Sequence, residues 1–172
     1  MKVEIGGLIS TDYERVVELF ALLGPRYAAD VADPKTRRVF DLYLDDERKV
    51  AVAARVDGQL VGILLFEVTP LLAPTLCHAR ADGMVVDPAF QRRGIGLRLL
   101  RAGLRVTAER GATSFLAKAS DPAVIDLYRR VPELEERGVY FYYNPRPELV
   151  REGPVEKDRP DSGAAAEESF HS

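Results

Sequence analysis

Apolar residues recur at helical spacing in two stretches near the start of the chain. In the stretch 10–24, apolar side chains recur every three to four residues, Ser10 or Thr11 is a candidate N-cap, and Gly24 offers a stop. The stretch 33–46 has a similar pattern and begins with an Asp-Pro pair, which is typical of a helix start. We therefore predict two helices after a short opening strand.

Three runs of β-type residues follow these helices. The runs 49–56 and 59–68 flank an Asp-Gly dipeptide that favours a two-residue hairpin turn, so these strands should pair antiparallel. The run 75–86 alternates in polarity and contains Gly83, which indicates a bulge or a close backbone approach. Strict alternation would place Asp82 on the same face as Met84 and Val86.

The remaining elements are predicted from the pattern beyond residue 86. A long helix spans about 94–110, a strand 113–120, a short helix 121–130 and a final strand 138–144. The predicted order is β-α-α-β-β-β-α-β-α-β, which describes an α/β fold with one mixed sheet and helices on both faces.

Composition places these elements in a single domain. The chain has 172 residues; we assign 1–150 to one domain and the Pro-, Gly-, Ser- and charge-rich stretch 151–172 to a flexible tail. The single cysteine permits no disulfide within the chain and no thiol-rich metal site. We expect no metal, because no His, Asp or Glu cluster has ligand spacing. A net charge of −3 does not favour nucleic acid or a membrane surface as partner. No secretory signal and no apolar run of about 20 residues are visible, so a soluble, cytoplasmic protein is expected.

The segment 91–96, QRRGIG, joins a strand to the start of a helix. Backbone N–H groups at a helix N-terminus lack partners and carry partial positive charge, so they favour an anion. Glycine lets backbone approach a bulky ligand, and Arg92 and Arg93 add charge. A dinucleotide-binding fingerprint would need glycine at position 99, which is Leu99, and the chain has no Gly-Lys-Ser/Thr run. The loop therefore predicts a pyrophosphate site of another kind.

The helix after this loop has two different faces. Gly103 lies within a wide apolar arc, so the helix should pack closely on the sheet. Arg98, Arg101 and Arg105 share the opposite face. We interpret them as a solvated surface, and binding of nucleic acid by this face remains an alternative.

These motifs resemble those of the GNAT superfamily of N-acetyltransferases. The segment 91–96 matches its Q/R-x-x-G-x-G/A signature, the preceding VDPAF (86–90) is similar to its V-x-P-x-Y/F lead-in, and the element order to about residue 144 is that of its fold. The resemblance implies acetyl-CoA as co-substrate, with the pantetheine arm on the strand before the loop. The implied cofactor-binding residues are Val85, Val86, Gln91, Arg92, Arg93, Gly94, Ile95, Gly96, Leu97 and Asp121.

The stretch 121–128, DPAVIDLY, resembles the family's N-x-x-A-I-x-L-Y helix. The resemblance puts Tyr128 at the position of the general acid that protonates the departing thiolate. Two departures stand out: Asp121 replaces the common asparagine, and Pro132-Glu133 replaces a Gly-Phe pair. The alternative for Tyr128 is a core aromatic residue.

Two carboxylates are candidates for the base that receives the amine's proton. Asp82 lies four residues before Val86, where the resemblance implies an acidic residue, and Glu67 lies late in its β run. For both, a solvated or ion-paired carboxylate is the alternative, and His78 is interpreted as structural. The acceptor pocket is expected within 24–46 and 69–76, with candidate residues Arg26, Tyr27, Asp30 and Tyr43.

The sequence thus predicts an acetyl-CoA-dependent N-acetyltransferase that works by direct transfer to a primary amine in a ternary complex. The acceptor, a small molecule or a protein or peptide, is left open, as is assembly as a homodimer. The second interpretation is a non-catalytic acyl-CoA-binding or regulatory module on the same fold.

Overall fold

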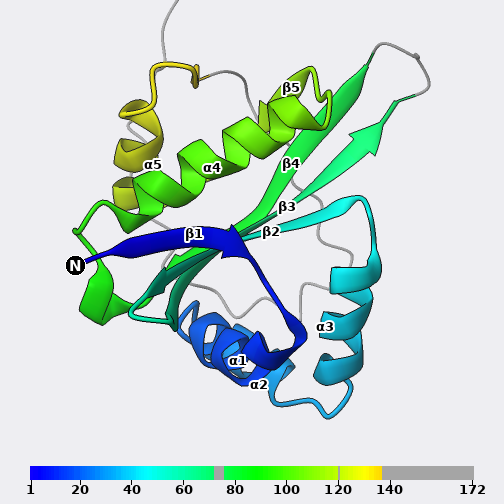
Figure 1. Ribbon diagram of the computed structural model, residues 1–172, viewed down its shortest axis with the longest axis vertical. Coiled ribbons are helices and arrows are strands. Elements are labelled where there is room, and N and C mark those ends of the chain that lie inside the picture. Colours follow the sequence, from blue (N-terminus) through cyan, green and yellow to red (C-terminus); the bar gives the residue numbers. More distant parts are fainter. Residues whose placement is uncertain (72–75, 120, 137–172) are drawn as a thin grey trace, which may run out of the picture. The chain divides into compact units, whose positions relative to one another are not determined.

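The computed structural model describes residues 1–71, 76–119 and 121–136 of the chain. These residues form five strands, five α-helices and two short 3-10 turns (Figure 1). The strands are β1 (Val3–Gly7), β2 (Lys49–Val56), β3 (Gln59–Pro70), β4 (Cys77–Val86) and β5 (Ser114–Leu116). The helices are α1 (Tyr13–Ala21), α2 (Pro25–Val31), α3 (Thr36–Asp45), α4 (Ile95–Glu109) and α5 (Pro122–Arg129), and the turns are η1 (Ser10–Asp12) and η2 (Pro88–Phe90).

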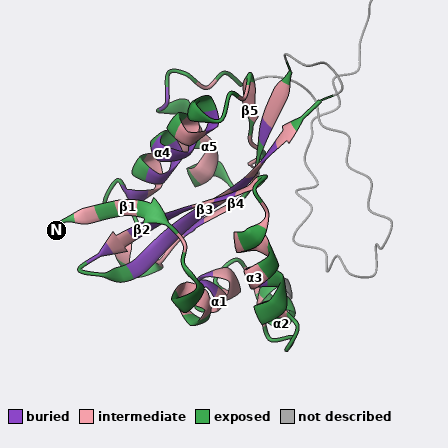
Figure 2. Cartoon of the chain, turned by 45° about the vertical axis from the view of Figure 1, so that its right-hand side comes forward, coloured by how far each residue is buried: buried purple, intermediate pink, exposed green. Residues whose placement is uncertain are grey.

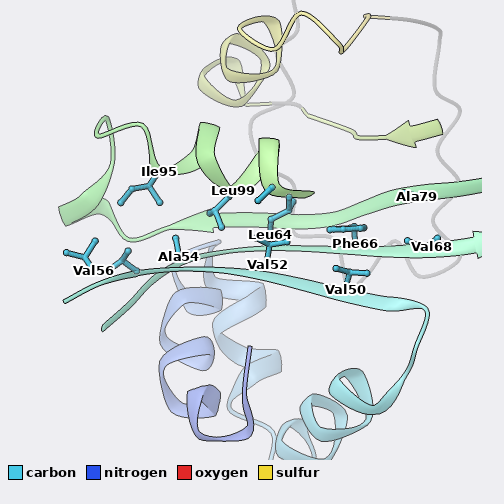
Figure 3. Close-up of a cluster of buried hydrophobic side chains, with 12 residues drawn as sticks. Val50, Val52, Ala54, Val56, Leu64, Phe66, Val68, Ala79, Ile95 and Leu99 are labelled. Carbon is cyan, nitrogen blue, oxygen red and sulfur yellow. The ribbon is translucent and has the colours of Figure 1, made fainter. Parts of the chain in front are cut away.

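The five strands form one mixed sheet in the order β1-β2-β3-β4-β5. Each of the first three strands is antiparallel to the next, and β5 is parallel to β4. Helix α4 crosses one face of the sheet, and α1 and α3 lie against the other (Figures 1 and 3). This arrangement confirms the predicted α/β fold with helices on both faces.

Each face of the sheet has its own apolar core. On the α4 face, side chains of the strands and of α4 pack together, among them Val52, Leu64, Phe66 and Leu99 (Figure 3). On the other face, Leu19 of α1 and Phe40 of α3 pack with Ile63 and Val85. Burial is accordingly concentrated on the strands and on the helix sides that face them (Figure 2). The sheet is therefore held rigidly from both sides, which fixes the ends of its strands.

The hairpin between β2 and β3 forms as predicted. Asp57 and Gly58 have φ angles of 50° and 81°, the left-handed conformation that a tight two-residue turn requires. The strands pair antiparallel from Val56 opposite Gln59. One residue, Val61, is left out of the register, because Leu60 pairs with Arg55 and Gly62 with Ala54.

A second bulge lies in β4, next to Gly83 as predicted. Gly83 is opposite Leu65 and Ala81 is opposite Phe66, so Asp82 is the extra residue. The residues of β4 that face α4 therefore change from odd-numbered to even-numbered at this point. Ala79 packs towards α4 before the bulge, and Met84 packs towards it after the bulge. The strict alternation expected from the sequence is wrong here, and Asp82 does not share a face with Met84 and Val86.

Several element boundaries differ from those expected. Ser10 and Thr11 lie within η1 and do not cap a helix; α1 begins after Asp12, which instead accepts a hydrogen bond from the Ile9 N–H at 2.8 Å. Helix α2 was not predicted, although Gly24 and Pro25 stand at its start. Helix α3 begins three residues later than expected, because an Asp33-centred turn precedes it. Strand β5 is shorter than 113–120, and the predicted strand 138–144 lies outside the described residues.

Candidate active site

The segment between β4 and α4 is a tightly folded loop. Asp87 directly follows β4 and caps η2 by accepting a hydrogen bond from the Ala89 N–H at 2.8 Å. The Gln91 side chain turns back and donates to the Val86 carbonyl at 2.9 Å. Arg92 and Gly94 then adopt positive φ angles of 57° and 77°, which turn the chain into the first turn of α4. Positive φ at Gly94 explains why glycine suits this position.

The loop presents a row of backbone donors. Within the described residues, the N–H groups of 92–97 donate no hydrogen bond to backbone or side chains, and the first such donor along α4 is Arg98, which bonds the Gly94 carbonyl. Helix α4 is fifteen residues long. Its aligned peptide dipoles therefore give its N-terminus the equivalent of about half a positive elementary charge. Arg93 stands beside this N-terminus with its guanidinium 5.6 Å from the Phe90 ring centre. The arrangement fits a bound polyanion such as a pyrophosphate.

The strand that leads into the loop has an open edge. β5 pairs only with His78, Ala79 and Arg80 of β4. From Ala81 to Val86, no strand of the described part of the chain pairs with β4 on its β5 side, although β3 pairs with it on the other. The open stretch contains Val85 and Val86 and ends where the loop begins. An extended ligand could therefore pair with this edge and place its anionic end in the loop.

Helix α5 packs against the start of α4. A Cβ added at Gly96 would lie 3.1 Å from Cδ2 of Leu127, so glycine permits this close approach. Asp121 caps α5 by accepting a hydrogen bond from the Ala123 N–H at 2.7 Å, which gives this residue a structural role; its contact with a cofactor stays a prediction. The neighbour of Leu127, Tyr128, is half-buried, and burial raises the pKa of its phenol above the usual 10.0. Tyr128 therefore stays protonated at neutral pH and can donate a proton.

Glu67 and Asp82 meet on one face of the sheet, around Lys49. The Lys49 ammonium donates a hydrogen bond to Glu67 Oε2 and lies 3.6 Å from Asp82 Oδ2. Arg80 approaches the same two carboxylates at 3.4 and 3.7 Å. Thr69 donates to Glu67 at 3.2 Å. The two candidate bases thus form one ion-pair cluster, next to the point where β4 separates from β5.

The charges of this cluster alter its proton affinities. The hydrogen bond from Lys49 lowers the pKa of Glu67 below its usual 4.5, and the same contact raises the pKa of Lys49. Tyr43 lies beside the cluster, and its pKa is raised by burial and by the negative charge of Asp82. Lys49 was missed by sequence reasoning, because nothing in its local sequence distinguishes it from a surface lysine of a strand.

The candidate acceptor residues are distributed differently. The Tyr43 hydroxyl donates to the Val50 carbonyl at 3.0 Å, which gives it a structural contact between α3 and β2. Tyr27 and Asp30 are exposed on α2. His78 is partly buried where β4 pairs with β5. A role of these residues in binding the acceptor therefore stays a prediction.

The arginine face of α4 is exposed, as expected. Arg98, Arg101 and Arg105 line a shallow groove together with Ile5 of β1 and Ala102. Among residues 1–71, 76–119 and 121–136, no three His, Cys, Asp or Glu side chains gather in a way that could hold a metal ion. In that same part of the chain, no helix combines the length and apolar character needed to cross a membrane.

Comparison with known proteins identifies the family. The sequence model of the acetyltransferase (GNAT) family matches residues 16–131. The chain is 36% identical over 130 residues to the N-alpha-acetyltransferase RimI of Mycobacterium tuberculosis, covering 75% of this chain and 77% of that protein. Its fold matches the aminoglycoside acetyltransferase meta-AAC0020 from an uncultured soil metagenomic sample with a TM-score of 0.67, at 25% identity, over 83% of this chain and 95% of that one.

A further solved structure contains a coenzyme A group. AAC(6')-Iy, in complex with the bisubstrate analog CoA-S-monomethyl-acetylneamine, matches with a TM-score of 0.65 at 19% identity, over 84% of this chain and 99% of that one. The chain therefore belongs to the GNAT family of acetyltransferases, which use acetyl-CoA and transfer its acetyl group to amines.

Proposed function

We propose that this protein transfers an acetyl group from acetyl-CoA directly to a primary amine, with both substrates bound at once. The observation that carries the proposal is the row of backbone N–H groups at 92–97 that have no partner among the described residues, next to the edge of β4 that no described strand covers. A coenzyme with an extended, amide-bearing arm that ends in a pyrophosphate matches both features in the same order: the arm fits the strand edge, and the pyrophosphate fits the N–H groups of the loop. Val85 and Val86 would pair with the arm, and residues 91–97 would hold the pyrophosphate, with Arg92 and Arg93 adding charge.

The acetyl transfer needs a neutral amine and a good leaving group. The amine nitrogen forms a bond to the thioester carbonyl carbon, and the carbon–sulfur bond then breaks. Tyr128 is proposed to give its phenolic proton to the departing sulfur, which supports release because a thiol leaves more easily than a thiolate. The proton lost by the amine returns to solvent, and the phenolate regains a proton, so the cycle is balanced.

The role of the carboxylates follows from their surroundings. Because Lys49 lowers the pKa of Glu67, this carboxylate is a weak base for a protonated amine. We therefore propose that Glu67 and Asp82 act together, by orienting a water molecule that removes the amine's proton and by attracting a cationic acceptor. The lowered pKa supports this indirect role over direct proton abstraction by Glu67.

The N-terminal amine of a protein or peptide is the first candidate acceptor, because the relative with 36% identity is an N-alpha-acetyltransferase. An aminoglycoside is the second, because the solved structure with 25% identity is an aminoglycoside acetyltransferase. Three acceptors separate these candidates. A short lysine-containing peptide with a free N-terminus is compared with the same peptide carrying a blocked N-terminus, in which only the lysine amine is left, and with an aminoglycoside.

The experiment has two stages. Calorimetry with acetyl-CoA tests the donor side, and release of free thiol in the presence of each amine tests transfer. We expect binding of acetyl-CoA and turnover with the free N-terminus above the blocked peptide. Binding of acetyl-CoA without turnover on any amine would instead support the non-catalytic module, and failure to bind acetyl-CoA would overturn the proposal.

A further inference from the structure

Arg15 of α1 reaches the beginning of the loop between β4 and α4. Its guanidinium forms an ion pair with Asp87 and donates to the Leu60 carbonyl at 3.0 Å through Nε. A third contact joins it to Glu18, one turn further along α1. The Arg15 and Asp87 side chains are only 25% and 18% exposed, so water shields their attraction incompletely. The contact joins residues 72 positions apart in the sequence.

Asp87 is the junction through which β4 becomes the loop. Its N–H donates to the Val61 carbonyl at 2.9 Å, and its Oδ1 accepts from the Ala89 N–H. Oδ2 faces Arg15. The loop then turns back, because the Gln91 side chain bonds the Val86 carbonyl directly before Asp87. The Asp87 carboxylate therefore belongs to the same short segment as the donors that would bind an anion, and precedes them by five to ten residues along the chain.

A carboxylate at this place opposes the chemistry of the loop. The N–H groups without a partner among the described residues, the α4 N-terminus and two arginines all favour negative charge in a ligand, whereas a negative charge on Asp87, in the same segment, acts against it. The shape of the Asp87 side chain is nevertheless needed, because its Oδ1 caps η2 and so fixes the backbone that leads into the loop. A cation that neutralises the Asp87 carboxylate would remove this repulsion. Arg15 of α1 is the cation that contacts this carboxylate.

We propose that Arg15 is a positioning residue for coenzyme binding: it neutralises and orients the Asp87 carboxylate, so that the loop retains its shape and binds the coenzyme's pyrophosphate without repulsion. This inference rests on the proposed function of the loop. It assigns to α1 a share in affinity for the donor, although α1 has no residue in the loop itself. The charge that matters is the one on Asp87.

The test compares coenzyme binding by wild type, Arg15→Met, Asp87→Asn and the double variant, using calorimetry with CoA at low and high salt. We expect Arg15→Met to weaken CoA binding about tenfold at low salt, because a partly shielded carboxylate then faces the anion, and less at high salt. Asp87→Asn should bind CoA at least as tightly as wild type, because asparagine still caps a helical turn. The double variant should recover most of the lost affinity.

A second measurement separates charge from general damage to the fold. We expect the kcat/KM for S-acetylpantetheine, which lacks the pyrophosphate, to be nearly the same in Arg15→Met and wild type, whereas that for acetyl-CoA falls. Arg55→Met is the matched control: Arg55 forms another partly buried ion pair, with Asp12, away from the loop sequence, so its loss should affect the two donors equally.

The outcomes are separable. Unchanged CoA binding in Arg15→Met, or a double variant no better than Arg15→Met, would overturn this inference while leaving the proposed function intact. If Arg15→Met does not fold, Asp87→Asn alone decides, because weakened CoA binding in that variant contradicts the inference. A wild-type protein that does not bind CoA would overturn the proposed function and this inference with it.

Discussion

A Cβ atom at Gly103 would lie 2.5 Å from Cδ2 of Leu64, a distance that real side chains do not tolerate. Leu64 is fully buried in the middle of β3, so it has no room to move aside. Helix α4 therefore approaches the sheet to a distance that only glycine permits. The same helix begins at the loop whose N–H groups have no partner in the described part of the chain, so its placement on the sheet also places the candidate cofactor site.

Replacing Gly103 with alanine should destabilise the fold. The substitution gains about 1 kcal/mol of helix propensity but overpacks a closed core, which costs about 1–3 kcal/mol. We expect a net loss of about 1 kcal/mol in the free energy of unfolding, measured with urea. In a Leu64→Ala background the added methyl has space, so Gly103→Ala should there be neutral or stabilising. An equal loss in both backgrounds would contradict the close packing.

Tyr128→Phe should lower kcat for acetyl transfer about a hundredfold, because the departing thiolate loses its proton donor. The affinity for acetyl-CoA should not change. Because burial raises the pKa of Tyr128, no loss of activity from its ionisation is expected below pH 10. Tyr13→Phe is the matched control: the Tyr13 ring packs on Phe40 in the core formed by α1 and α3, so this variant should leave kcat nearly unchanged. Equal kcat values for Tyr128→Phe and wild type would refute the assignment.

Lys49→Met should flatten the dependence of stability on pH in the acid range. The pKa of Glu67 is lowered in the folded state, so the ion pair stabilises the protein above the usual pKa of 4.5 and is lost as the pH falls through the lower, folded value. Removing the ammonium moves the folded pKa back towards 4.5 and removes this loss. Urea unfolding from pH 7 to pH 3 measures the effect. Glu67→Gln should remove the same part of the pH dependence, and the double variant should remove no more.

Arg93→Ala should weaken binding of CoA and make it less sensitive to salt, because one cation beside the α4 N-terminus is lost. We expect a loss of about five- to tenfold at low salt, measured by calorimetry. Arg98→Ala is the control on the exposed face of α4, and should change neither affinity nor salt dependence appreciably. Equal losses in both variants would mean that only the overall charge matters.

The parts of the fold that could be predicted depend on neighbours in the sequence. The Asp57-Gly58 turn is local, and its two left-handed residues fix the pairing of β2 and β3. The loop at 91–96 is also local, because glycine positions and a following helix can be read directly. Gly103 could be interpreted correctly because its place in the apolar arc follows from helical period alone.

The carboxylate cluster could not be predicted, because it depends on two bulges. A regular two-residue hairpin would place Glu67 opposite Arg48, and the bulge at Val61 shifts its partner to Lys49. The bulge at Asp82 similarly turns this residue towards Lys49 and away from the side of Met84. Gly83 indicated an irregularity, but its effect on the facing of each residue depends on which position is the extra one.

Helix α2 was missed for a different reason. Gly24 was interpreted as the end of the preceding helix, and it also stands immediately before the first residue of the next. Pro25 at that first position is a helix-start signal, because proline needs no N–H partner there. The whole helix has seven residues, about two turns, which is too short for a helical period to be recognised in the sequence.

The bulge at Asp82 adds one residue to β4 and so changes which residue numbers face α4. Everything upstream of it, up to Ala81, is read with odd-numbered residues towards α4, and everything downstream with even-numbered ones. Deleting Asp82 would place Ala81 and Met84 two positions apart, so regular alternation would keep Met84 and Val86 facing α4 and Val85 facing the other core, without the bulge. A homologous chain that lacks this residue should therefore show unbroken alternation through the strand, and an alignment should place its single-residue gap at Asp82, with the polarity pattern of the next four positions unchanged.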